Sequence, residues 1–124
     1  MSSYTVRVEA DFAAAHFLAD YHGKCEKLHG HNYLVRLWAK GAELDGGGML
    51  LDFGRLKEAL RGVCKKLDHT KLNDHPAFHD NPSAERIAAF IFDECGKSLA
   101  VEEAALLHAV DVYETPSSMA RYEP

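Results

Sequence analysis

Alternating apolar residues at the start of the chain constrain its fold more than any other feature of the sequence. Every second residue from Tyr4 to Ala14 is apolar or aromatic, and most of the residues between them are polar or charged. Successive side chains of a strand point to opposite faces of a sheet, so this alternation predicts a half-buried strand of an antiparallel sheet. If the strand continues for two more residues, His16 lies at the end of its apolar face.

A second alternating stretch, from about residue 29 to residue 40, begins with a pair of histidines. His29 and His31 are two residues apart, so both side chains leave an extended backbone from the same face. The rest of that face is apolar and carries Tyr33, Val35, Leu37 and Ala39. Pairing of the two strands would bring His16 close to the histidine pair.

Three imidazoles in one place favour a metal centre, because a catalytic zinc site has three protein ligands and one open position. Zinc (Zn2+) is the expected ion, with iron, nickel and cobalt left open. Cys25, four residues before His29, has two alternative roles. A thiol near a cation loses its proton more readily and acts as a base or nucleophile, or it becomes the fourth ligand of a closed structural site.

The middle of the chain predicts two amphipathic helices. One begins at an Asp52 N-cap, and its apolar stripe at spacings of three and four runs to Leu67. The second begins at Asn81-Pro82, with Ser83 as a competing cap, and ends at Gly96. The cysteines of these helices lie on or beside the apolar stripes and are interpreted as packed structural thiols.

Two more strands, at about 104–115 and 118–122, complete the chain. The element order ββααββ predicts an α+β fold: a four-stranded antiparallel sheet with both helices on one face. The length of 124 residues fits a single domain over residues 1–124. Such a sheet leaves edge strands that need covering, so we expect the chain to form a homo-oligomer.

Two groups of polar residues outside the histidine stretch are candidates for chemistry. Asp68 and His69 follow the first helix, where an aspartate that orients a histidine gives an acid/base pair, or where the histidine interacts with the helix dipole. Glu114 ends the apolar face of the third strand. A carboxylate without a partner is costly in such a position, so Glu114 is expected to have a binding role.

Composition limits the classes of partner. The formal net charge of −5 argues against a protein that coats nucleic acid. We expect no membrane partner, because no apolar run is long enough to span a bilayer and the N-terminus lacks the signal-peptide pattern. Three widely separated cysteines do not form a disulfide framework, so a cytoplasmic location is expected.

Taken together, these motifs resemble the 6-pyruvoyltetrahydropterin synthase family. The resemblance is carried by His16 after two alanines, by Cys25 to His31, by Leu67-Asp68-His69 and by Tyr113-Glu114-Thr115. It implies a tunnelling (T-) fold in which trimers close into a barrel and two trimers stack as a hexamer. The pterin substrate then binds in a pocket between subunits.

The same resemblance implies a role for each site residue. Zinc is held by His16, His29 and His31; Cys25 abstracts a proton; Asp68 and His69 form a partner acid/base pair. Glu114 anchors the guanidine-like edge of the pterin as a bidentate acceptor.

Within the family, the short spacing from Cys25 to His29 resembles the bacterial 6-carboxy-5,6,7,8-tetrahydropterin synthases of queuosine biosynthesis. This implies conversion of 7,8-dihydroneopterin triphosphate, with release of acetaldehyde and triphosphate. Glu26 gives a second pattern, Glu-x-x-His-Gly-His, which resembles members that cleave dihydroneopterin to 6-hydroxymethyl-dihydropterin and glycolaldehyde. A 6-pyruvoyltetrahydropterin synthase, a bifunctional enzyme and a non-catalytic zinc- or pterin-binding oligomer are the remaining alternatives.

Overall fold

Two long antiparallel strands form the centre of the fold. The computed structural model describes residues 2–23 and 26–124. Strand β1 (Tyr4–His16) pairs with β2 (His29–Gly41) without interruption, from Tyr4 opposite Gly41 to His16 opposite His29. The other elements are α1 (Phe53–Leu67), β3 (Thr70–Lys71), the 3-10 turns η1 (Leu72–Asp74) and η2 (Pro76–Phe78), α2 (Ala84–Ser98), α3 (Val101–Ala104), β4 (Leu107–Thr115) and β5 (Ser118–Tyr122).

The sheet differs from the predicted one in strand number and direction. Its order is β3-β1-β2-β4-β5, and β3 runs parallel to β1 while the other neighbours are antiparallel. The prediction of four antiparallel strands was therefore wrong, although the α+β class is confirmed. Strand β3 has only two exposed residues, Thr70 and Lys71, and so carries no alternation that a sequence pattern could reveal.

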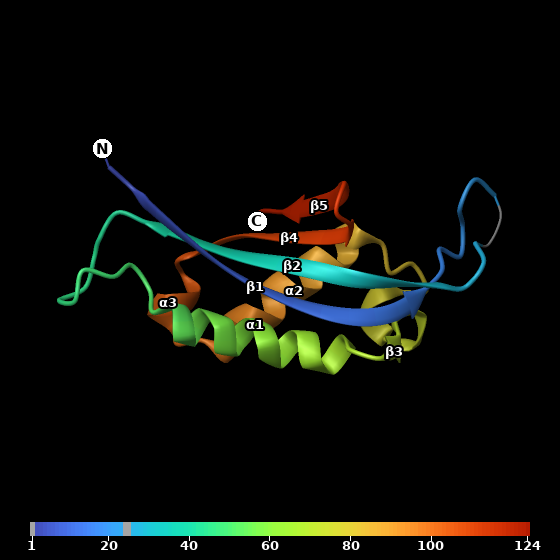
Figure 1. The fold of residues 1–124 in the computed structure, drawn as a ribbon, viewed down its shortest axis with the longest axis horizontal. Helices are drawn as coiled ribbons and strands as arrows, with labels where there is room; N and C mark the ends of the chain where they lie inside the picture. Colours follow the sequence, from blue (N-terminus) through green and yellow to red (C-terminus); the bar gives the residue numbers. More distant parts are fainter. Residues whose placement is uncertain (1, 24–25) are drawn as a thin grey trace.

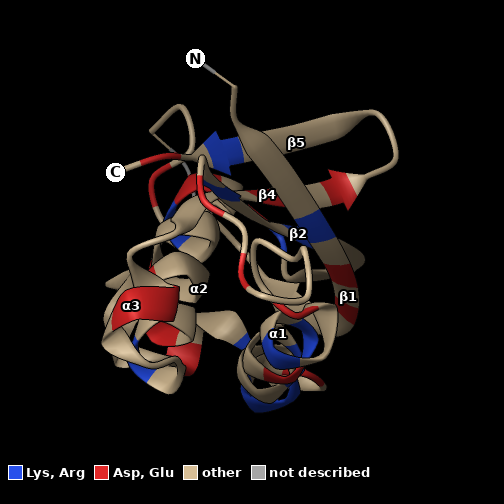
Figure 2. Cartoon of the chain, turned by 90° about the vertical axis from the view of Figure 1, so that its left-hand side faces the viewer, with Lys and Arg blue, Asp and Glu red and all other residues tan. Residues whose placement is uncertain are grey.

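Helices α1 and α2 cover one face of the sheet (Figures 1 and 2). The Asp52 side chain accepts a hydrogen bond from the Gly54 amide, which confirms the predicted N-cap. Cys64 and Cys95 are buried, and burial raises the pKa of each thiol to about 12, as expected of packed, unreactive cysteines. Phe53, by contrast, is 55% exposed and does not join the buried stripe of α1.

The second helix begins and ends later than predicted. The Ser83 hydroxyl, rather than Asn81, caps α2 by accepting from the Arg86 amide. Asn81 is used elsewhere, because its side-chain oxygen accepts from the Ala19 amide across the fold. The helix also continues through Gly96 to Ser98.

The third predicted strand, at about 104–115, starts three residues late, at Leu107, because α3 occupies the preceding segment. Within α3, the Glu103 carboxylate accepts from the Ala100 amide and closes the first turn. In the part of the chain that the structure describes, none of the helices combines the length and apolar character needed to cross a bilayer.

Candidate metal centre and active site

Three histidines converge where β1 ends and β2 begins. The pairing of the strands puts His16 opposite His29 and Ala14 opposite His31. Since His29 and His31 share a face with His16, each of the three residues offers one ring nitrogen, and these three nitrogens lie within 4.8 Å of one another. The rings meet edge to face, with centroids 4.7–5.0 Å apart. The predicted convergence of the three imidazoles is thus observed in the fold.

Backbone carbonyls orient two of the three rings. His16 Nδ1 donates to the Pro82 carbonyl at 2.9 Å, and His29 Nδ1 donates to the Lys27 carbonyl at 2.8 Å. A carbonyl only accepts, so in each ring Nδ1 carries the proton and Nε2 keeps its lone pair. This is the usual way in which a protein fixes the tautomer of a metal-binding histidine.

His31 supplies an independent sign that the site fits a cation. Its Nε2 is buried and has no hydrogen-bond partner among the described residues. Burial lowers the pKa of His31, and the neighbouring His16 and His29 lower it further, against an opposing effect of Glu114. Histidine binds a metal ion in its neutral form, through a ring nitrogen that has no other partner, and His31 meets both conditions. His16, His29 and His31 would hold a zinc ion through these ring nitrogens.

Glu114 lies against the same cluster, at the end of the β4 face. Its Oε1 is 4.0 Å from His16 Nε2, and its Oε2 is 3.9 Å from His31 Nε2. Neither distance is a hydrogen bond, so in the described residues the carboxylate keeps its accepting capacity for another group. The carboxylate that seemed costly on an apolar face therefore lies beside the candidate metal position.

Asp68 and His69 form a pair at the exit of α1. His69 Nδ1 lies 2.8 Å from Asp68 Oδ2, while Asp68 Oδ1 accepts from the Ala13 amide at 2.9 Å. The hydrogen bond from the Ala13 amide and the hydrogen bond with His69 both lower the pKa of Asp68. The Asp68 carboxylate is therefore ionised at neutral pH and accepts from Nδ1 of the His69 imidazole. His69 has a φ of 57°, a left-handed conformation that is strained for a residue with a Cβ.

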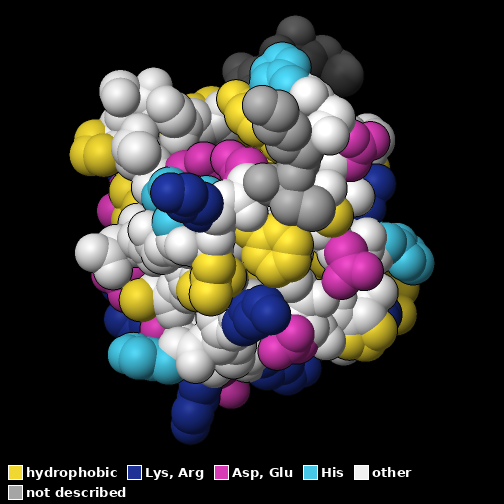
Figure 3. All heavy atoms as spheres, turned by 90° about the vertical axis from the view of Figure 1, so that its right-hand side faces the viewer, with side chains coloured by type: hydrophobic (Ala, Val, Ile, Leu, Met, Phe, Trp, Pro, Cys, Tyr) yellow, Lys and Arg dark blue, Asp and Glu magenta, His cyan; other side chains and the backbone are white. Residues whose placement is uncertain are grey.

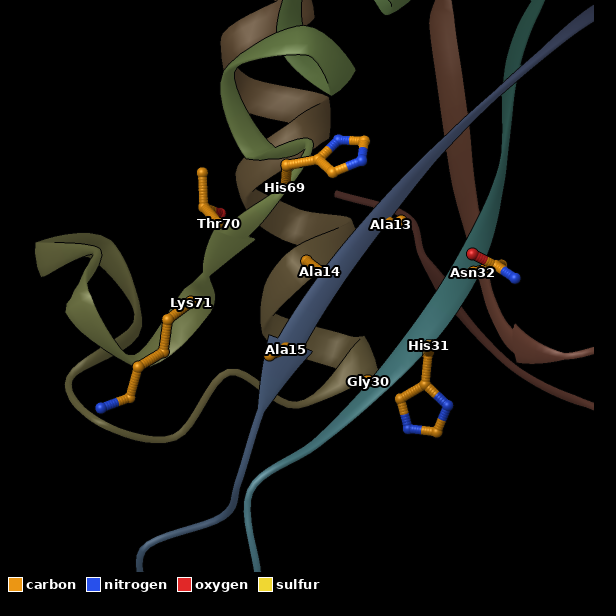
Figure 4. Close-up of a pocket in the computed structure, with 9 residues that line it drawn as sticks. All are labelled: Ala13, Ala14, Ala15, Gly30, His31, Asn32, His69, Thr70 and Lys71. Carbon is orange, nitrogen blue, oxygen red and sulfur yellow. The ribbon is translucent and has the colours of Figure 1, made fainter.

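One chain does not bring the acid/base pair into contact with the histidine cluster. His31 and His69 both line a shallow depression of about 500 Å³, together with residues 13–15 of β1. Figure 4 shows the two rings on either side of the β1 ribbon, and they do not point toward each other. The His69 side chain is 83% exposed. Its ring is therefore available to a neighbouring molecule rather than to the histidines of its own chain.

The end of the molecule that carries this depression is chemically mixed. In Figure 3, acidic and basic side chains on this face alternate with apolar ones, so neither sign of charge dominates it.

The loop before β2 contains the two residues that distinguish the alternative activities. Cys25 lies outside the described residues. Glu26 is half-buried; its Oε1 accepts from the Leu18 amide at 2.9 Å, and its own amide donates to the Leu18 carbonyl. Glu26 thus ties the two sides of the loop together, in addition to any chemical role.

Two residues that support the site were missed in the sequence. The buried Asn73 side chain accepts from the Phe17 amide and donates to the Phe17 and Asp80 carbonyls, which fixes the chain directly after His16. Tyr33 was interpreted only as an apolar strand residue, but its ring contacts those of His16 and His31. The role of Asn73 has no local sequence signal, because it depends on contacts made across the fold. For Tyr33, the signal was its place on the same strand face as His29 and His31.

Comparison with known proteins identifies the family. Residues 5–124 match the family model described as 6-pyruvoyl tetrahydropterin synthase. The chain belongs to this family. This confirms the resemblance found in the motifs, and it places the histidine cluster in a fold shared by pterin synthases.

Individual family members cover almost all of the chain. It is 40% identical over 121 residues to a 6-carboxy-5,6,7,8-tetrahydropterin synthase of Synechocystis, covering 92% of this chain and 88% of that protein. The structure of Caenorhabditis elegans 6-pyruvoyl tetrahydropterin synthase superposes with a TM-score of 0.86 at 27% identity, over 100% of this chain and 97% of the other. A Plasmodium vivax 6-pyruvoyltetrahydropterin synthase, solved with a catalytic glutamate replaced by alanine, gives 0.83 at 26% identity and covers 100% and 99%.

Replacement of His69 separates backbone strain from chemistry. His69→Gly and His69→Ala both remove the imidazole, but only glycine adopts the left-handed conformation without strain. We predict that urea unfolding finds the glycine variant more stable than the alanine variant by about 1 kcal/mol. Equal stabilities of the two variants would contradict the claim that the backbone at His69 is strained.

Proposed function

We propose that this protein is a zinc-dependent lyase that converts 7,8-dihydroneopterin triphosphate and one water molecule to 6-carboxy-5,6,7,8-tetrahydropterin, with release of acetaldehyde and triphosphate. This is a step of queuosine (7-deazaguanine) biosynthesis. The observation that carries the proposal is the histidine cluster, with its ligand nitrogens within 4.8 Å and two of its tautomers fixed for binding. The similarity to the Synechocystis 6-carboxytetrahydropterin synthase supports this choice within the family.

The histidines His16, His29 and His31 would hold the metal. When bound there, zinc supplies Lewis-acid polarisation of the oxygens on the pterin side chain, which makes the adjacent C–H more acidic. Three neutral imidazoles leave the 2+ charge of the ion uncompensated and one position open, as this chemistry requires.

Glu114 is suited to bind the pterin ring. Its carboxylate is 29% exposed and has no hydrogen bond in the described residues, so both oxygens can accept N–H groups from the amino-pyrimidine edge. Paired N–H donors on a planar ring match a carboxylate in the same way as a guanidinium does. The role of Glu114 as pterin anchor thus agrees with its charge and its placement.

Proton transfer is assigned to Cys25 and to the Asp68–His69 pair. Cys25 would take the proton next to the polarised oxygen, and His69, held by Asp68, would exchange protons during the later carbon–carbon cleavage. Because the His69 ring projects away from its own cluster, we propose that each site combines the histidines of one subunit with the acid/base pair of another. A trimer, or a hexamer of two stacked trimers, would provide this arrangement, and a monomer would be inactive.

Product analysis tests the proposal. Zinc-loaded protein supplied with 7,8-dihydroneopterin triphosphate is expected to release acetaldehyde in step with 6-carboxytetrahydropterin, as measured by chromatography of both products. Formation of 6-pyruvoyltetrahydropterin alone would contradict the proposed reaction. Binding of pterin and metal without any turnover would instead identify a non-catalytic oligomer.

Glu26 supports a second candidate activity, cleavage of dihydroneopterin to 6-hydroxymethyl-dihydropterin and glycolaldehyde for folate synthesis. A glutamate is catalytic in the similar Plasmodium vivax enzyme, and here Glu26 is half-buried in the loop next to Cys25. A carboxylate is able to act as the base in place of a thiolate.

The same product analysis distinguishes the two candidate bases, Cys25 and Glu26, when unphosphorylated dihydroneopterin replaces dihydroneopterin triphosphate as the substrate. If the second activity is present, glycolaldehyde is released and is lost in Glu26→Gln, which retains an oxygen to accept from the Leu18 amide. The Cys25→Ala variant would keep this product but lose acetaldehyde. Absence of glycolaldehyde from the wild-type protein would exclude the second activity.

A further inference from the structure

Tyr33 lies beneath the histidine cluster and is completely buried. Its relative exposure is 0%. The ring stacks on Phe12 with centroids 4.8 Å apart, and its edge-to-face contacts with His16 and His31 have centroid distances of 5.9 and 5.4 Å. The aromatic ring is therefore fixed on one side by the core and on the other by two of the candidate metal ligands.

The hydroxyl of Tyr33 has no hydrogen-bond partner among the residues that the structure describes. An unpaired buried hydroxyl is unfavourable, and native proteins seldom keep one without a use. A phenylalanine would fill the same space and avoid this cost.

Among the described residues, the other groups around the histidine cluster accept hydrogen bonds and do not donate them. The Nε2 atoms of His16 and His29 offer lone pairs, and the Glu114 carboxylate only accepts. None of these groups can donate to an oxygen atom bound at the open position of the metal. Tyr33 is in contact with two of the three ligand rings, and its O–H has no acceptor in the part of the chain that the structure describes.

We propose that the Tyr33 hydroxyl donates a hydrogen bond to the ligand oxygen at the open metal position. For the proposed function, this oxygen belongs to a hydroxyl on the side chain of the pterin, so Tyr33 selects pterins with an oxygenated side chain. The identity of the ligand rests on the proposed function, whereas the donor role needs only the metal and an oxygen ligand.

Tyr33→Phe tests the donor directly, because it removes one oxygen and keeps the ring. Pterin fluorescence would measure the affinity of the zinc-loaded protein for neopterin, which has side-chain hydroxyls, and for 6-methylpterin, which has none. We expect the variant to bind neopterin about tenfold more weakly and 6-methylpterin equally well. Its melting temperature without ligand should equal or exceed that of the wild type, since no existing hydrogen bond is lost.

Tyr113→Phe is the matched control. The Tyr113 hydroxyl accepts from Arg36 at 3.0 Å rather than contacting the histidines, so its removal should leave both affinities unchanged. Equal loss for both pterins in Tyr33→Phe would show that the hydroxyl only maintains the shape of the pocket. No loss for either pterin would also overturn the proposal.

A second probe separates failure of this inference from failure of the proposed function. If neither pterin binds the wild-type protein, the pterin assignment fails, but the donor is still measurable with acetohydroxamate on the cobalt-loaded protein. Changes in the visible cobalt spectrum report its binding through oxygen. The donor role predicts about tenfold weaker binding in Tyr33→Phe, and equal binding would contradict it.

Discussion

The pairing register of β1 and β2 is the constraint on which the rest of the structure depends. His16 and His29 are exact partners across the ladder, and His31 lies opposite Ala14 on the same face. Because side chains alternate with a period of two, a slip of one residue would turn one set of histidines to the opposite face. The buried face of both strands opposes such a slip, since Val8, Phe12, Tyr33, Val35 and Leu37 would lose their places in the core with it. The energy of the core thereby fixes the geometry of the metal centre.

Segments far from the strands complete the centre by their backbone groups. The Pro82 carbonyl, directly before the Ser83 cap of α2, holds His16, while Asn73 holds the chain that follows it. The start of α2 is thus coupled to the orientation of one metal ligand. Orienting groups of this kind narrow the motion of a ligand ring and so favour one coordination geometry.

The sequence was most informative where a periodic pattern carried the chemistry. The parity of His16 with the apolar face of β1, and of His29 with His31, was sufficient to predict their convergence. It was least informative where a contact across the fold decides the outcome. Asn81 was predicted to cap α2, but it binds the Ala19 amide and leaves the cap to Ser83. Strand β3 is too short to show alternation, and the use of Tyr33 depends on its hydroxyl rather than on its apolar ring.

The central claim is that three imidazoles, and no thiolate, hold the metal and leave one position open. X-ray absorption at the zinc edge of the zinc-loaded protein measures this directly, because Zn–N distances are about 2.0–2.1 Å and Zn–S distances about 2.3 Å. The account predicts three imidazole nitrogens and one further light-atom ligand at the shorter distance. A sulfur ligand at the longer distance would place Cys25 in a closed structural site and contradict the account.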